Sequence, residues 1–349
     1  MLSRLDVRPT VVDTPLNDEM PPVAVQAGLA DIFVPIDLGF LPGGLTGIAS
    51  AINDSGWIAG VSSSLGGDHV FLYKNGVMLD YGDIPNGLGS LSVADLNNRG
   101  VIVGSGIQRG SNVERAFYST PQGRLVLIPA PHRFDGYTTV AAGINDSNVV
   151  AGTIYSPDFT VAHAIVWSRS LGFRDIHPVG PYTHSFAYSI SAANQLAGNV
   201  YVSSPSIAQH AFMWPAIAPA GIDLSATGGT SAAAAINASG VIVGIDANPV
   251  PTTAMQWTAQ TGIVRLPWGS STAAAVSELG RIVGHSTLTG TTAASTSLGT
   301  GPPIALPLLP TWRYSNAAWA VNRCGDIVGY AVAVTGENRP ALWRHSPCD

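Results

Sequence analysis

The feature that most constrains this sequence is a nine-residue phrase that occurs seven times. Its first copy, residues 52–60, reads Ile-Asn-Asp-Ser-Gly-Trp-Ile-Ala-Gly. The other copies are residues 96–104, 144–152, 190–198, 236–244, 276–284 and 321–329. The closing glycines are 40 to 48 residues apart. A period of this length is one supersecondary unit, so the chain must assemble seven similar units.

Each unit contains two further phrases. An apolar phrase follows six copies, at residues 69–73, 115–118, 163–167, 210–214, 253–257 and 339–343. A third, shorter phrase completes the unit, as at residues 221–224 and 263–266. Asn-x-x-Gly between two apolar runs predicts a tight hairpin, because the Asn side chain can bond the turn and glycine accepts a positive φ. We therefore expect four short strands in each unit.

The residues before each hairpin are small, such as Ala49 and Ala51 or Ala233 and Ala235. Small side chains indicate a strand in a crowded place, and the innermost strands of radially arranged sheets are crowded. Four strands in about 45 residues are typical of a β-propeller blade. The sequence predicts an all-β, seven-bladed propeller in one domain, residues 31–349, after an N-terminal tail, residues 1–30. Residues 34–38 should complete the last blade beside residues 339–344.

The repeat phrases also resemble a known family. His-Ala-Phe at residues 210–212, Ala-Ile-Asn-x-x-Gly-x-Ile-Val-Gly at residues 235–244 and Asp-Leu-Gly at residues 37–39 are similar to the bacterial "HAF" repeat. That repeat is described as extracellular, and the resemblance covers roughly residues 34–345. It implies the blade and carries no catalytic assignment. No signal peptide is visible, so the default expectation is a cytoplasmic protein, and the resemblance implies an extracellular one.

Composition excludes several classes of function. The net charge is −6 and basic residues form no run, so a nucleic-acid partner is not expected. Apolar stretches are short and interrupted by Pro or Gly, so no membrane span is expected. No metal motif and no dinucleotide fingerprint in a suitable context occur, and we expect neither a metal nor another cofactor.

The sequence contains two cysteines, Cys324 and Cys348, and does not decide whether they form a disulfide. Both should lie on the same face of the last blade. Strand spacing places them about 10 Å apart unless the C-terminus folds inward, whereas a bridge needs about 7 Å or less between Cα atoms.

A functional site is expected on one face of the ring. The Asn-x-x-Gly hairpins should form one face, which we call the turn face, and the long, dissimilar connections between blades should form the other, which we call the crossing face. Variable loops on a rigid scaffold tend to carry function. Ring-bearing and cationic residues of the connections should surround the axis and contact a ligand, namely Arg133, Tyr137, Tyr182, Trp268, Trp312, Arg313 and Tyr314. Alternatively, such rings fill gaps between blades.

Histidines supply the candidate chemistry. His132 with Asp135 or His184 could act as a general acid and base, and Arg133 or Arg313 could stabilise an oxyanion. His69, His163 and His210 repeat at one blade position, which favours a hydrogen bond to a neighbouring strand. Asp95 should be a solvated carboxylate near the axis.

Two hypotheses follow. The first is a cofactor-independent lyase, cyclase, isomerase or hydrolase that acts on a small organic substrate. The alternative is a non-catalytic module that binds a glycan or a partner protein. The oligomeric state stays open.

Overall fold

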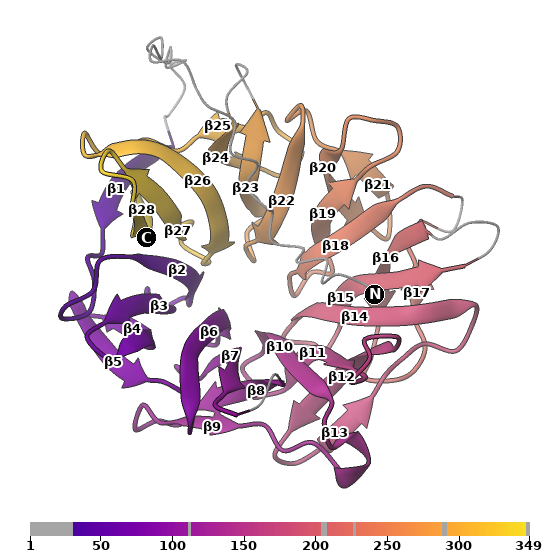
Figure 1. Ribbon diagram of the computed structural model, residues 1–349. Helices are drawn as coiled ribbons and strands as arrows, with labels where there is room; N and C mark the ends of the chain where they lie inside the picture. The colour runs from indigo at the N-terminus through magenta and orange to yellow at the C-terminus, as the bar shows by residue number, and fades with distance from the viewer. Residues whose placement is uncertain (1–30, 111–112, 204–207, 226–227, 288–291, 347–349) are drawn as a thin grey trace.

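Seven sheets of four antiparallel strands are arranged around a central axis, like the blades of a propeller (Figure 1). The computed structural model describes residues 31–110, 113–203, 208–225, 228–287 and 292–346. Within these ranges the elements are strands, apart from the single-turn 3-10 helix η1 (His132–Phe134). The all-β, seven-bladed propeller predicted from the repeat is confirmed. The predicted tail, residues 1–30, lies outside the described residues.

In blades 1 to 6 the strands follow one another in the chain from the axis outward. Blades 1 to 3 are β2 (Gly47–Ile52), β3 (Ile58–Ser64), β4 (Gly67–Lys74) and β5 (Val77–Gly82); β6 (Gly87–Leu96), β7 (Ile102–Gln108), β8 (Glu114–Ser119) and β9 (Leu125–Leu127); and β10 (Thr138–Ile144), β11 (Val150–Tyr155), β12 (Ala162–Ser168) and β13 (Gly172–Asp175). Blades 4 to 6 are β14 (Tyr182–Ile190), β15 (Leu196–Val202), β16 (Ala208–Trp214) and β17 (Ile222–Asp223); β18 (Ser231–Ile236), β19 (Ile242–Asp246), β20 (Thr253–Thr258) and β21 (Gly262–Arg265); and β22 (Ser271–Val276), β23 (Arg281–Thr287), β24 (Thr292–Leu298) and β25 (Ile304–Ala305). Blade 7 is β26 (Trp312–Val321), β27 (Ile327–Ala333), β28 (Asn338–Ser346) and, outermost, β1 (Ile32–Asp37).

The Asn-x-x-Gly phrase forms the turn between the first and second strands of a blade, as predicted. In blade 1 the side-chain oxygen of Asn53 accepts hydrogen bonds from the backbone N–H groups of Ser55 and Trp57, at 3.1 and 3.0 Å. Gly56 has a φ of 72°, a conformation that glycine adopts without steric cost. The phrase therefore encodes the turn locally, before any packing between blades.

Each innermost strand carries a β-bulge beside the closing glycine of the repeat. In blade 4 the register shifts between Ala187 and Ser189, and Gly198 pairs with Ala187. A Cβ atom on Gly198 would overlap the carbonyl oxygen of Phe186, and the equivalent glycines of the other blades face the same overlap. The bulge brings two backbones together, which explains why the repeat ends in glycine.

The first strand closes the ring by pairing with the last one. β1 runs antiparallel to β28, with Phe33 opposite His345 and Asp37 opposite Ala341. The Arg339 side chain donates a hydrogen bond to the Asp37 carboxylate across this pair. The predicted closure by the N-terminal strand is confirmed, and β1 covers the edge that β28 would otherwise expose.

One carboxylate ties the closing strand to two blades. Asp31, just before β1, accepts two hydrogen bonds from the Arg281 guanidinium of blade 6, at 3.0 and 2.9 Å. His345 Nε2 of blade 7 is 3.0 Å from the same carboxylate. The Arg281 side chain is only 6% exposed, so Asp31 compensates a buried charge.

This carboxylate should make stability depend on pH. The Arg281 hydrogen bond, and then those of His345 and the charges of both, hold the pKa of Asp31 below its ordinary value despite partial burial. A pKa that is lower in the folded state contributes stability above the unfolded pKa and loses it as the pH falls. We expect Asp31→Asn to reduce the free energy of unfolding at pH 7 by about 1 kcal/mol in denaturant titrations.

The deficit of Asp31→Asn should shrink below a pH of about 3.9, where the carboxyl of the unfolded wild-type chain begins to be protonated, and should vanish below the lower pKa of the folded state. Asp135→Asn is the control, because Asp135 is 78% exposed and should change stability little. A deficit that is equal at pH 7 and pH 2 would contradict a role of the Asp31 charge.

Cys324 lies in the turn between β26 and β27 and is disulfide-bonded. Its backbone oxygen is 3.0 Å from His345 Nδ1, which links this turn to β28. Cys348, the partner that the sequence offers, lies outside the described residues.

Candidate functional site

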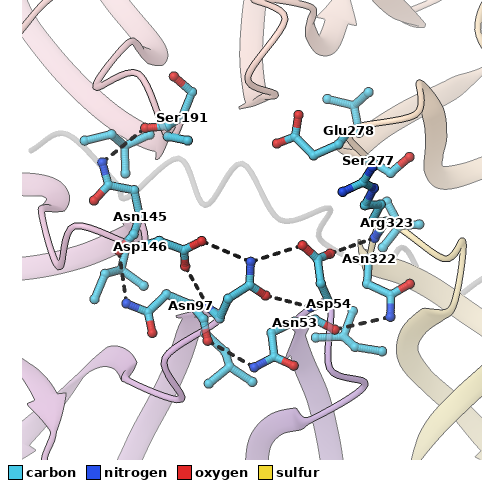
Figure 2. A pocket seen from close by; sticks show the side chains of 18 of the residues that line it. Asn53, Asp54, Asn97, Asn145, Asp146, Ser191, Ser277, Glu278, Asn322 and Arg323 are labelled. Carbon is cyan, nitrogen blue, oxygen red and sulfur yellow. Dashed lines mark hydrogen bonds between the residues drawn. The ribbon is translucent and has the colours of Figure 1, made fainter.

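A small cavity lies on the axis at the turn face (Figure 2). Its volume is about 160 Å³. Polar residues of the turns line it together with the apolar residues that end the innermost strands, Ile52, Leu96, Ile144, Ile190, Ile236, Val276 and Val321.

Asparagine side chains around this cavity join neighbouring blades. The Asn97 amide donates to the backbone oxygen of Asn145 at 3.0 Å, and the Asn145 amide donates to that of Ser191 at 3.1 Å. The same bond to the next turn is made by Asn53, Asn237 and Asn322. Much of the recurring polarity of the turn phrase therefore serves the contact between blades.

The acidic residues of the cavity are used in the same way. Asp54 accepts hydrogen bonds from the Arg323 backbone N–H at 2.9 Å and from the Asn98 amide at 3.0 Å (Figure 2). Within the described ranges no three His, Cys, Asp or Glu side chains are placed to hold a metal ion. The geometry favours a structural role for this face.

The predicted catalytic residues lie in two separate places. His132 Nδ1 is 3.6 Å from Asp135 Oδ2, and both side chains are open to solvent, at 104% and 78% exposure. His184 is in β14, where its Nδ1 is 2.9 Å from Thr183 Oγ1 and its Nε2 is 3.0 Å from the backbone oxygen of Thr160. No contact among the described residues joins His184 to His132 or Asp135.

Two of the predicted ligand contacts are buried tryptophans. Trp268 is 0% exposed, and its indole N–H donates to the Gly301 backbone oxygen at 3.4 Å. Trp312 is 4% exposed and packs edge-on against Trp343, with ring centroids 6.0 Å apart. A buried ring offers no face to a ligand, so these residues fill gaps between blades in this structure.

The other predicted contacts are dispersed over the crossing face. The Arg133 guanidinium lies 4.7 Å from the centroid of the Phe134 ring, and Tyr137 packs edge-on against that ring with centroids 5.3 Å apart. Arg313 is exposed and Tyr314 is partly buried. Arg133 lies beside His132 in η1, and among the described residues none of these four has a contact with His184.

The repeated histidines bond the outermost strand of their own blade, as predicted. His163 Nδ1 is 2.8 Å from Asp175 Oδ2. The same pair recurs as His69 with Asp80 and His210 with Asp223. Burial disfavours the charged form of Asp175, but hydrogen bonds from His163 and the His177 backbone outweigh it and the pKa of Asp175 lies below its ordinary value.

His177 is a packing residue of the connection between blades 3 and 4. It stacks on His163 with centroids 4.1 Å apart, and burial, followed by the charge of His163, lowers its pKa. Its Nε2 donates to the backbone oxygen of Tyr182 at 3.2 Å, so in the neutral ring Nδ1 accepts from the Ser185 hydroxyl at 2.8 Å. Tyr182 itself packs edge-on against Phe212.

Asp95 and His285 also have hydrogen-bond partners within the protein. Asp95 accepts the backbone N–H groups of Leu96 and Ile144, both at 2.8 Å, and so bridges blades 2 and 3 where a solvated carboxylate was expected. Burial lowers the pKa of His285, whose Nδ1 is 3.0 Å from Thr272 Oγ1.

A group of partly exposed rings gathers where blades 3 and 4 meet at the crossing face. We call it the ring cluster, and it consists of Tyr155, Phe159, His184, Phe186, Tyr188 and Tyr201. Centroid separations between neighbouring rings are 6.0, 6.0, 5.7 and 5.9 Å from Phe159 through Tyr155, Phe186 and Tyr201 to His184. Tyr188 extends the group along β14 toward the turn face, 6.2 Å from Phe186.

One ring of the cluster is held in an uncommon backbone conformation. Phe159 has a φ of 57°, which is rare for a bulky residue. Its turn is fixed because Asp158 Oδ1 accepts hydrogen bonds from Ser156 Oγ at 2.6 Å and from Thr160 Oγ1 at 2.9 Å. The same turn presents the Thr160 backbone oxygen to His184. Backbone outliers of this kind gather at functional sites.

Sequence reasoning named His184 and missed the other five rings, although the repeat contained a signal. Tyr188 lies two positions before the Ile that opens the turn phrase, and Trp319 holds the same position in blade 7. The other five blades have small residues there, namely Ser50, Ala94, Ala142, Ala234 and Ala274. A large ring at a position that the fold keeps small is not explained by blade packing alone.

Comparisons with known proteins identify the fold. No protein-family model matches the sequence, so the resemblance to the HAF repeat is not supported by a family match. No curated protein matches the sequence either. A prolyl endopeptidase structure is 11% identical with a TM-score of 0.57, over 86% of this chain and 50% of that one. The chain thus spans about half the length of that enzyme. No helix among the described residues has the length and apolar character needed to span a membrane.

Two further propeller structures are similar. The β-propeller domain of the Trilobed protease from Pyrococcus furiosus is 9% identical with a TM-score of 0.51, over 86% of this chain and 96% of that one. Prolyl oligopeptidase B from Galerina marginata is 8% identical with a TM-score of 0.52, over 81% and 46%. At these identities the likeness concerns the fold alone, and the fold is a seven-bladed β-propeller closed by its first strand.

Proposed function

We propose that this protein is a binding propeller that holds a small organic or carbohydrate ligand against the ring cluster on the crossing face. The observation that carries the proposal is the group of mutually contacting, partly exposed rings that includes Phe159, Tyr201 and His184. Aromatic faces with polar edges suit ligands that combine apolar faces and hydroxyl groups. The constrained turn at Phe159 supports it independently.

Binding is favoured over catalysis by the surroundings of the histidines. His132 and Asp135 stand in open solvent, where water competes for every hydrogen bond to a substrate. Both ring nitrogens of His184 already have oxygen partners in the protein. A general base needs a free nitrogen within reach of the proton it takes.

The test uses neutral ring-bearing probes. Indole and methyl β-glucoside are titrated while ligand-detected NMR reports contact. We expect Tyr188→Ala and Phe159→Gly to weaken binding of whichever probe binds by at least about tenfold, the cost of losing one stacked ring. Glycine at 159 keeps the positive φ of the turn.

Tyr118→Ala is the matched control, since Tyr118 stacks on Trp167, away from the cluster, with centroids 5.3 Å apart. Binding that is equal in all variants would place the site elsewhere, and the absence of binding by either probe would contradict the proposal.

A hydrolase is the second candidate, because His184 belongs to the ring cluster and could act on a bound substrate once its bond to Thr160 opens. His132 and Asp135 would then need to approach His184 from another connection. Turnover of a nitrophenyl ester or glycoside that is lost in His184→Gln supports this candidate, and unchanged turnover contradicts it.

A further inference from the structure

His177 and His163 form a stacked pair of imidazoles where blade 3 meets blade 4. The ring centroids are 4.1 Å apart and the ring planes differ by 12°. The Asp175 carboxylate holds both residues, because it lies 2.8 Å from His163 Nδ1 and accepts the His177 backbone N–H at 2.9 Å. Two titratable rings therefore lie face to face and share one carboxylate.

Blade 4 contains the same network without a second imidazole. His210 Nδ1 lies 2.8 Å from the Asp223 carboxylate, which accepts the Ser225 backbone N–H at 2.9 Å. The Ser225 hydroxyl bonds the Ser231 hydroxyl. Ser225 thus has the place in its blade that His177 has in blade 3. The junction between blades therefore does not require a titratable group at this place.

The surroundings of His177 accept only the neutral ring. Its Nε2 donates to the Tyr182 backbone oxygen, and its Nδ1 accepts from the Ser185 hydroxyl. Ser185 is 0% exposed, and its oxygen also accepts the Ala164 N–H at 2.9 Å. A proton on Nδ1 would turn the Ser185 hydroxyl away, and the contacts of the described residues give that hydroxyl no other acceptor. Its buried hydrogen would lose its partner, which disfavours protonation.

The charges around His177 act in the same sense as these bonds. The titratable groups that face His177, or its partner Tyr182, come from β12, β13, β14 and β17 and are His163, Asp175, His184 and Asp223. Burial lowers the pKa of His177 most, and the positive charge of His163 lowers it further. The bond to Tyr182 and the charge of Asp175 oppose this shift only in part.

The lowered pKa links proton binding to opening of the connection. In an open connection His177 regains its ordinary pKa of 6.5. The open form then binds a proton between about pH 5 and 6 that the closed form excludes, so the closed form loses stability as the pH falls through this range. Asp175 has a pKa below its ordinary value and keeps its charge there.

His177 is also the only polar side chain of this connection, which comprises residues 176–181 between β13 and β14. Two further bonds tie the connection to blade 4. The Trp214 indole N–H donates to the Ile176 backbone oxygen at 3.0 Å, and the Val179 N–H donates to that of Pro219 at 3.1 Å. Residues 179–181 are exposed, so this stretch can separate from blade 4 without unfolding a strand.

Opening of the connection would reach the ring cluster. The connection leads directly into Tyr182, Thr183 and His184 at the start of β14. His184 Nδ1 accepts from the Thr183 hydroxyl, and its Nε2 donates to the Thr160 backbone oxygen. Both bonds depend on where the start of β14 lies, so a displacement of that start moves His184 away from the Phe159 turn.

We propose that His177 makes the connection between blades 3 and 4 open on mild acidification, and that this opening releases the ligand of the ring cluster. The opening is independent of the proposed function, whereas the release of a ligand rests on it.

Hydrogen exchange, read by mass spectrometry on peptides of the full-length protein, tests the opening. Exchange in residues 176–183, corrected for the effect of pH on the chemical rate, should rise by about tenfold from pH 7 to pH 5. His177→Ser, which copies Ser225 of blade 4, should keep its protection at pH 5. His163→Asn keeps a donor for Asp175 and removes the stacked charge, so it should reduce the rise.

His210→Asn is the matched control, because it changes the equivalent histidine of blade 4, where Ser225 takes the place of a second imidazole. It should leave the response of residues 176–183 to acid unchanged. Equal protection of these residues at pH 7 and pH 5, or the same rise in the wild type and in His177→Ser, would overturn the inference. If His177→Ser lowers protection at both values, an undiminished rise in His163→Asn overturns it.

The consequence for binding is measured with indole and methyl β-glucoside at both pH values. The probe that binds should bind about tenfold more weakly at pH 5, and His177→Ser should remove most of this difference. Unchanged affinity in spite of opening would overturn the release of ligand. If neither probe binds at pH 7, the proposed function fails, and the exchange data still decide whether the connection opens.

Discussion

Gly198→Ala is expected to reduce the free energy of unfolding by about 3 kcal/mol or more, although it adds a single methyl group. The added Cβ would overlap the carbonyl oxygen of Phe186 on the paired strand. Because that atom is backbone and is fixed by the bulge, it cannot rotate away as a flexible side chain would. Relief requires the bulge to open, and denaturant unfolding followed by far-UV circular dichroism measures the cost.

Gly66→Ala is the control for the general effect of removing a glycine. Gly66 lies in the loop between β3 and β4, and the nearest atom that a Cβ there would meet belongs to the His69 ring, at 3.3 Å. Its stability should change by less than about 0.5 kcal/mol. Gly244→Ala, in blade 5, should repeat the large effect, because its Cβ would overlap the Ala232 carbonyl oxygen. Equal stabilities of the Gly198 and Gly66 variants would show that the bulge does not require glycine at the end of the repeat.

The fold could be predicted because its determinants are local and occur seven times. The turn at Asn53 is specified within five residues by an Asx side chain and a glycine. Repetition separates such a signal from chance, and the number of copies gives the number of blades. The unmatched apolar phrase at residues 34–38 then indicated how the ring closes.

The site could not be predicted in the same way, because its side chains differ from one blade to the next and the residues expected there lie largely in connections that do not repeat. Whether Trp268 faces solvent depends on Gly301, 33 positions later in the chain, whose oxygen accepts its N–H. The exposure of His132 likewise depends on where its connection runs, which no local pattern specifies. Tyr188 differs from these residues, because its position belongs to the repeat. The only sequence signal for it was a large ring where five other blades have a small residue.

Closure of the ring should be the largest single contribution to its cooperativity. Deletion of residues 1–37 removes β1, and with it the pairing of β28 and the buried side chain of Phe33, which packs with Trp343 and Val283. The loss exposes a strand edge and an apolar surface between blades 6 and 7. We expect this variant to lose its cooperative thermal transition, measured by calorimetry, whereas deletion of residues 1–30 alone should preserve it.

A smaller change tests the same seam if the truncated chain is insoluble. A bond between Asp37 and Arg339 joins β1 to β28. Blades 1, 3 and 4 have a histidine–aspartate pair between their two outer strands instead. Asp37→Ala and Arg339→Ala should each cost about 1 to 2 kcal/mol, and the double variant should cost less than their sum, because the two residues act on one bond. Additive losses, or a deletion of residues 1–37 that melts like the deletion of residues 1–30, would show that β1 and β28 close the ring in space without stabilising it.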